Sequence, residues 1–153
     1  MGTARAALVL CVVLTACGSE SGNVRDRSSD SPLGGGIGLR LTVSPERPVS
    51  AQPVTWLLTL TNEGVEAVDL TFASGKSGDV VLRRDGKEAH RWSDGRFFTE
   101  AVRHVRVPPN QAKEYRLQDP GLAVKAGRYD LIATLASEPA PDPVRRSIEV
   151  FAG

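Results

Sequence analysis

The residue types that most often carry chemistry in proteins, cysteine and histidine, occur only twice each in this chain of 153 residues. His90 and His104 do not stand at the spacing of a metal site, and neither has a cysteine partner nearby. A serine beside either histidine would form a nucleophile and base, but the sequence alone does not bring two such residues together. We interpret each histidine as a surface residue of a strand. The sequence therefore predicts no catalytic residues, no metal site and no cofactor, which argues against an enzyme.

The charge of the chain is nearly balanced. Lysine and arginine together number 19 and aspartate and glutamate 18, which gives a net charge of +1. Proteins that bind nucleic acids carry a basic footprint, and proteins that bind membranes through charge carry a polybasic cluster. The composition therefore argues against both kinds of partner.

The first seventeen residues have the pattern of a secretion signal. Arg5 is followed by an apolar run over residues 6–14, which is too short for a bilayer core of about twenty residues but is typical of a signal peptide. Leu14-Thr15-Ala16-Cys17 then resembles the lipobox of bacterial lipoproteins, an aliphatic residue and two small ones before a cysteine. This resemblance implies that residues 1–16 are removed, that Cys17 is lipidated, and that the protein sits on the extracytoplasmic face of the cell membrane. An ordinary signal peptide with a chance cysteine is the alternative.

Residues 17–36 form a second unit, rich in serine, glycine, aspartate and arginine. Val24 and Leu33 are its only sizeable apolar residues, so it cannot bury enough surface to offset the entropy of ordering. We predict that this unit is a disordered tether. Cys11 leaves with the signal peptide and Cys17 carries lipid, so we expect no disulfide, and the folded part must be held together by its core.

Residues 37–153 show apolar residues at every second position, the period of strands with one buried face. Such segments occur at residues 39–43, 54–60, 68–72, 80–82, 102–107, 115–117, 129–135 and 144–150. Asp85-Gly86, in the turn that ends the segment 80–82, is typical of a tight hairpin. The pattern predicts one all-β domain, an immunoglobulin-like antiparallel β-sandwich of seven to nine strands, with a small barrel as the alternative.

Several short motifs in this domain resemble a known family. The most specific is Trp92-Ser93-Asp94-Gly95, which leads through Phe97 and Phe98 into Thr99. The others are Leu60-Thr61-Asn62, Phe72-Ala73-Ser74-Gly75, Asp79-Val80-Val81 and Gly127-Arg128-Tyr129. Over residues 41–135 these motifs resemble the BsuPI family, named for an intracellular proteinase inhibitor of bacilli. The chain departs from the family's usual residues in having His90 and Glu100 in place of a tryptophan and a glutamine.

The segment from Trp92 to Thr99 has two interpretations. In the structural one, Trp92 fills the core, Asp94-Gly95 makes a turn, and Phe97 or Phe98 begins the buried face of the next strand. In the functional one, Trp92, Arg96 and one of the phenylalanines form an exposed hot spot.

An inhibitor also needs a loop that is already ordered before binding. Residues 74–78 and 93–97 are the candidate loops, and the sequence does not choose between them; the lack of disulfides makes order harder to achieve. The candidate binding residues are Trp92, Ser93, Asp94, Arg96, Phe97, Ser74 and Lys76.

Two functions from different classes follow from these patterns. The first is a membrane-anchored extracytoplasmic binding module, with proteinase inhibition as the activity that the family resemblance implies. Its partners are the membrane, through the lipid anchor, and an exported proteinase or another envelope protein. The alternative is a structural immunoglobulin-like spacer or assembly protein of the cell envelope.

Overall fold

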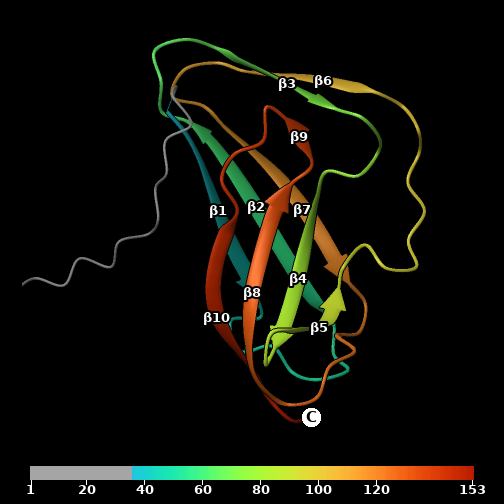
Figure 1. The fold of residues 1–153 in the computed structure, drawn as a ribbon. Helices are drawn as coiled ribbons and strands as arrows, with labels where there is room; N and C mark the ends of the chain where they lie inside the picture. The colour runs from blue at the N-terminus through green and yellow to red at the C-terminus, as the bar shows by residue number, and fades with distance from the viewer. Residues whose placement is uncertain (1–35) are drawn as a thin grey trace, which may run out of the picture.

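The computed structural model of the chain describes residues 36–153 (Figure 1). The predicted signal peptide (1–16), the predicted lipidation site Cys17 and the predicted tether (17–36), except for its last residue, lie outside the described residues. Within residues 36–153 no helix is long and apolar enough to cross a membrane.

Ten strands follow one another along the described part of the chain. They are β1 (Ile37–Ser44), β2 (Val54–Asn62), β3 (Val68–Phe72), β4 (Gly78–Arg84), β5 (Lys87–Arg91), β6 (Arg103–Val107), β7 (Ala112–Asp119), β8 (Gly127–Leu135), β9 (Ser137–Glu138) and β10 (Val144–Val150). All the pairings between them are antiparallel.

Two sheets form the layers of the molecule. One has the order β1-β2-β7 and the other the order β10-β8-β4-β5, and in Figure 1 the second sheet lies in front of the first. This arrangement confirms the predicted antiparallel β-sandwich. The number of strands is ten rather than seven to nine because two strands leave no periodic apolar signal: β5 is mostly exposed, and β9 has only two residues. Strand β6 begins just after Val102, which the pattern had placed inside the strand and which is exposed.

The core lies between the inner faces of the two sheets. On β2, Val54, Trp56, Leu58 and Leu60 are buried and alternate with half-buried residues. Strand β8 shows the same alternation, since every second residue from Tyr129 to Leu135 is buried. Both strands are central in their sheets, so their inward side chains make one continuous apolar cluster.

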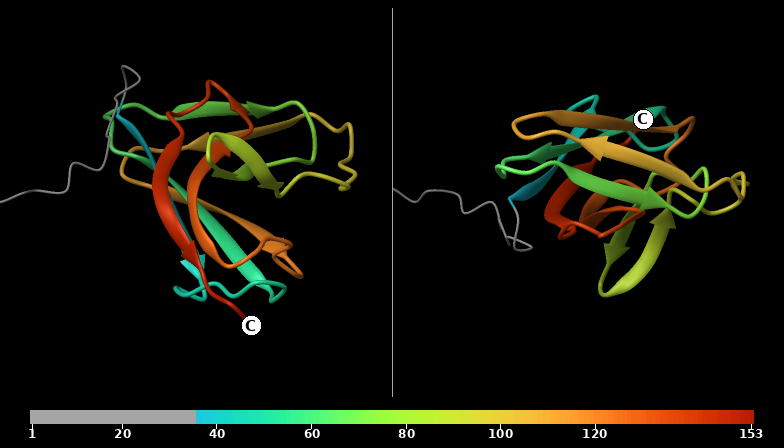
Figure 2. Two further views of the ribbon diagram at one scale, coloured as in Figure 1. Left: turned by 60° about the horizontal axis from the view of Figure 1, so that its bottom comes forward. Right: turned by 90° about the horizontal axis from the view of Figure 1, so that it is seen from above.

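A third sheet, with the order β6-β3-β9, closes one end of the sandwich. Strand β3 follows β2 and pairs with β6, which precedes β7, so this ladder is connected through the chain to two strands of the first sheet. Strand β9 follows β8 and pairs with β3 on its other side. Strand β3 therefore links the two layers, and Figure 2 shows β3 and β6 running side by side across this end.

Asn62 fixes the corner at which β2 gives way to β3. Its side chain is buried, and its amide nitrogen donates hydrogen bonds to the carbonyl oxygens of Glu66 at 2.7 Å and Val107 at 2.9 Å. Its side-chain oxygen accepts a hydrogen bond from the amide of Gly64 at 3.0 Å. This buried polar side chain is fully used, which is how a core tolerates such a group.

Candidate functional site

Two segments that are distant in sequence lie side by side on one flank of the sandwich. The first is the β3–β4 loop, residues 73–77, and the second is the long loop, residues 92–102, which connects β5 to β6. The amide of Gly75 donates a hydrogen bond to the carbonyl oxygen of Thr99 at 2.8 Å. A Cβ atom at Gly75 would lie 2.6 Å from Thr99 Oγ1, so the two loops approach this closely because Gly75 has no side chain. The two candidate loops of the sequence analysis therefore form a single surface.

The carboxylate of Asp79, at the start of β4, is bonded to both loops. Its Oδ2 accepts hydrogen bonds from Lys76 Nζ and from Ser93 Oγ, each at 2.6 Å. Its Oδ1 accepts hydrogen bonds from the amides of Val80 at 2.9 Å and Ser93 at 3.2 Å. Arg91 Nη1 lies 3.4 Å from Oδ2. Asp79 is only 5% exposed, and its charge is balanced by cations and hydrogen-bond donors. This carboxylate therefore connects the two loops close to the point where each meets the sandwich.

The same contacts determine the ionisation of Asp79. Burial raises the pKa of this carboxyl group, but the hydrogen bonds from Lys76 and Ser93 and the charge of Lys76 lower it further than burial raises it. The net pKa lies below the ordinary value of 3.8. Asp79 is therefore ionised at neutral pH, and its contacts with both loops are charge-assisted.

Trp92 and Arg96 fix the first half of the long loop to the sandwich. Trp92 is buried and its indole Nε1 donates a hydrogen bond to the carbonyl oxygen of Gln118, on β7, at 3.0 Å. The guanidinium of Arg96 lies over the indole, 4.5 Å from the ring centroid. Arg96 also donates through Nε to the carbonyl oxygen of Trp92 at 2.6 Å and through Nη2 to that of Gln118 at 2.9 Å. Its amide bonds to the carbonyl of Ser93 at 3.2 Å, closing a turn in which Gly95 has a φ of 68°.

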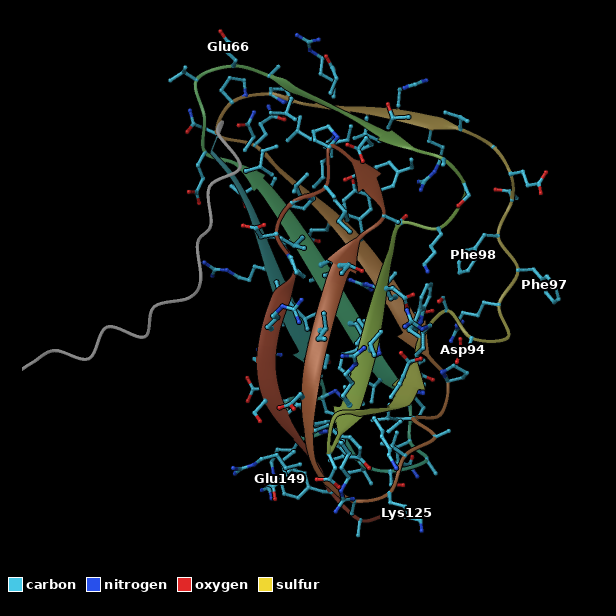
Figure 3. All side chains as sticks on the ribbon, viewed as in Figure 1. Glu66, Asp94, Phe97, Phe98, Lys125 and Glu149 are labelled. Atoms are coloured by element: carbon cyan, nitrogen blue, oxygen red, sulfur yellow. The ribbon has the colours of Figure 1, made fainter. Side chains whose placement is uncertain are left out.

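Phe97 and Phe98 point in opposite directions from the long loop. In Figure 3, Phe98 turns back toward the sandwich, whereas Phe97 points away from it. The ring centroid of Phe98 lies 5.7 Å from that of Trp92, with the two rings tilted by 44°. Phe97 is wholly exposed. The loop therefore presents one aromatic side chain to solvent, between two segments that are held by contacts with the rest of the domain.

The candidate residues of the long loop all lie on this flank, but their environments differ. Trp92 lies in the core, as the structural interpretation predicts, and is not part of an exposed hot spot. Arg96 covers its ring. Asp94 lies in the turn and is exposed, like Phe97.

The remaining candidates bind other parts of the same surface. Ser74 Oγ accepts a hydrogen bond from the amide of Lys76 at 3.2 Å, which shapes the β3–β4 loop. Lys76 and Ser93 bind the carboxylate of Asp79. These three residues order the surface, whereas Phe97 is its most exposed large apolar side chain.

Two residues of this flank were missed by the sequence analysis, namely Asp79 and Arg103. Ionised side chains are rarely buried unless they are paired. A charged residue at the start of a valine-rich strand is therefore unusual, and this position indicates a buried, paired carboxylate at Asp79. Arg103, on β6, donates to the carbonyl oxygen of Ser74 at 3.3 Å, to that of Gly75 at 3.4 Å and to Ser77 Oγ at 3.1 Å. No pattern in the sequence distinguishes Arg103 from the other arginines.

The expectation that His90 is a surface residue is wrong. Its side chain is 14% exposed, and Nε2 lies 2.7 Å from Oδ2 of Asp119, whose side chain is 6% exposed. His90 is on β5 and Asp119 on β7, so this pair joins the edges of the two sheets beneath the long loop. Burial raises the pKa of Asp119, but the hydrogen bond and charge of His90, together with the amide of Gly121 and the charge of Arg96, lower the pKa by more. His104 lies on β6 and is exposed, 3.2 Å from Thr71 Oγ1, as expected.

Among residues 36–153, no group of three histidine, cysteine, aspartate or glutamate side chains could hold a metal ion. What the flank does offer is an exposed aromatic side chain on a loop that is held in place by ion pairs, hydrogen bonds and ring stacking.

The fold and this flank define a class of protein, a β-sandwich domain with an ordered loop surface on one side. The family model described as "BsuPI: Intracellular proteinase inhibitor" matches residues 41–140, and the chain belongs to this family. No curated protein matches the chain. A solved structure of the CARDB domain of a Pyrococcus furiosus protein, in complex with di-metal ions, is similar at 13% identity and a TM-score of 0.46, covering 78% of this chain and 96% of that one. A sporulation control protein from Bacillus subtilis is similar at 12% identity and a TM-score of 0.46, covering 77% of this chain and 49% of that one.

Proposed function

We propose that this protein is a membrane-anchored binding module of the cell envelope that inhibits an exported proteinase. Membership of a family described as intracellular proteinase inhibitors supports the inhibitory activity. The lipobox-like residues from Leu14 to Cys17 support a lipid anchor and a place on the extracytoplasmic face of the membrane. The lipid on such a cysteine has two or three acyl chains, which meets the requirement for stable anchoring, since two acyl chains hold far more strongly than one.

The observation that carries the proposal is the fastening of two loops by one carboxylate. Asp79 binds Lys76 in the β3–β4 loop and Ser93 in the long loop. The hydrogen bond between Gly75 and Thr99 joins the same two loops a second time. A loop that is ordered before binding loses little entropy when it enters the cleft of a proteinase. The flank thus has the order that an inhibitor needs, and it has this order without a disulfide.

An inhibition assay tests the proposal. The domain of residues 37–153, which contains the whole apolar core, is titrated against a panel of subtilisin-like and chymotrypsin-like proteinases. We expect at least one of them to be inhibited at micromolar concentrations or below, and Asp79→Asn to inhibit it less well. Asp69→Asn is the matched control, because it removes an exposed ion pair with Arg106 on another sheet and should inhibit as the unaltered domain does. The absence of inhibition across the panel would reject the proteinase part of the proposal.

A separate measurement tests the anchor. Mass spectrometry of the protein from membranes should find chains that begin at Cys17 and carry lipid on its sulfur. An unmodified thiol at this position, or an intact chain in the cytosol, would reject the anchored location. Crosslinking in the native envelope then separates the two functions: a captured proteinase supports inhibition, and a stable complex with structural proteins alone supports the spacer or assembly alternative.

A further inference from the structure

Phe97 is the feature of the flank that neither the fold nor the fastening of the loops explains. An aromatic side chain buries a large apolar area when it is inside a protein, and leaving it wholly in solvent forgoes that gain. Phe97 is nonetheless fully exposed, whereas the next residue, Phe98, packs against Trp92. Fold stability therefore gives no reason for an aromatic residue at this position.

The residues on both sides of Phe97 are held. On one side, Arg96 is fixed by its stacking over Trp92 and by its hydrogen bonds to two carbonyl oxygens. On the other side, the Phe98 ring contacts Trp92 and the Thr99 carbonyl accepts the Gly75 amide. Phe97 is thus a single exposed side chain on a short segment whose residues are held by contacts on both sides. Figure 3 shows this side chain pointing away from the sandwich.

A side chain presented in this way matches the requirement of a proteinase specificity pocket. Such a pocket takes one side chain from an extended segment, and its chemistry decides which one: an apolar slot accepts an aromatic ring, and a pocket with an aspartate accepts arginine or lysine. The neighbouring Arg96 is not available for a pocket of the second kind, because its guanidinium is stacked and bonded to the sandwich. Of these two residues only Phe97 is free to enter a pocket.

We propose that Phe97 is the residue that enters the specificity pocket of the target proteinase, and that this pocket is therefore an apolar one that accepts aromatic side chains. This inference rests on the proposed inhibitory function and adds the contact residue and the substrate class of the partner. Within the interface, Phe97 is an aromatic anchor of the kind that dominates binding energy, and the ordered residues around it exclude water.

The test exchanges the chemistry of the projecting side chain in the full chain. Phe97→Arg and Phe97→Ala are compared with the unaltered protein in inhibition assays against chymotrypsin, subtilisin and trypsin. We expect the unaltered protein to inhibit chymotrypsin or subtilisin and not trypsin. Phe97→Ala should weaken that inhibition by about 30-fold or more, the loss typical of a hot-spot anchor. Phe97→Arg should weaken it similarly and gain inhibition of trypsin.

Two controls connect any loss to the pocket contact. Val65→Arg places the same charge at another wholly solvent-facing apolar position, 93% exposed and at the corner between β2 and β3, and should leave all inhibition constants unchanged. The urea midpoint of Phe97→Arg should equal that of the unaltered protein, because the Phe97 side chain is fully exposed.

The outcomes are distinguishable from those of the broader proposal. If the unaltered protein inhibits an enzyme and both Phe97 variants inhibit it equally well, the assignment of Phe97 is overturned while the inhibitory function stands. If the unaltered protein forms a dimer that Phe97→Ala abolishes, with inhibition unchanged, the side chain serves self-association and the assignment is again overturned. If no enzyme is inhibited, both proposals fail.

Discussion

Replacing Asp79 with asparagine tests whether one buried carboxylate orders both loops. Asparagine keeps the shape of the side chain but removes the charge and turns one oxygen into an amide nitrogen, which only donates. If this nitrogen takes the place of Oδ2, it faces the ammonium group of Lys76; if it takes the place of Oδ1, it faces the amides of Val80 and Ser93. In either orientation a donor opposes a donor.

The size of the effect follows from how buried the partners are. A hydrogen bond to a charged group contributes about 1.5–3 kcal/mol, and breaking a fully buried ion pair costs about 3–5 kcal/mol. The side chains of Lys76 and Arg91 are 29% and 36% exposed, so water can replace part of what they lose. We therefore expect Asp79→Asn to lower the free energy of unfolding by about 2–3 kcal/mol, less than for a fully buried pair.

Urea unfolding followed by tryptophan fluorescence measures this loss, since Trp92 lies at the root of the long loop. The matched control is Asp69→Asn, which breaks the ion pair between Asp69 and Arg106, two side chains that are each 68% exposed. We expect this control to change the free energy of unfolding by about 0.5 kcal/mol or less. Equal losses for the two variants would refute the reasoning, because burial and multiple bonding would then add nothing to the role of Asp79.

Three further predictions concern acid, the corner of the sheet and the contact between the loops. The lowered pKa values of Asp79 and Asp119 stabilise the fold at pH values above the ordinary carboxyl pKa of 3.8, and this contribution is lost as the pH falls through the lower folded-state values. At pH values below about 4 the urea concentration at the unfolding midpoint should therefore decrease, and it should decrease less in Asp79→Asn. Asn62→Ala removes three side-chain hydrogen bonds at about 1 kcal/mol each, so we expect a loss of about 2–3 kcal/mol in urea unfolding, and a loss below about 1 kcal/mol would contradict the role given to this corner. Gly75→Ala places a methyl group against Thr99, so we expect faster hydrogen exchange at the amide of residue 75 and weaker proteinase inhibition. An unchanged exchange rate would show that the two loops are not held together at this contact.

The period-two pattern was sufficient to predict most strands because their inward residues meet one core. Strand β2 is the clearest example, with a buried residue at every second position. The pattern does not reveal which strands pair, since the hydrogen bonds of β3 with β6 and with β9 join residues that are distant in the sequence. Strand β9 is also too short to show any period.

The candidate site was predicted in its location but not in its organisation. The Trp-Ser-Asp-Gly motif pointed to the long loop, and the turn at Gly95 is present. That Trp92 is buried and Phe97 exposed depends on how the loop folds back on β7, which no local pattern specifies. His90 was misjudged for the same reason, because its partner Asp119 comes from the edge of the opposite sheet.

The fastening of the two loops through Asp79 differs in kind from a covalent cross-link. Residues 36–153 contain no cysteine, so a thiol reductant leaves this part of the protein unchanged. Lys76 and Arg91 reach the carboxylate from partly solvated positions, where dissolved ions screen the attraction. Part of the stiffness of the surface therefore decreases as the ionic strength rises, and none of it depends on the redox state of the surroundings.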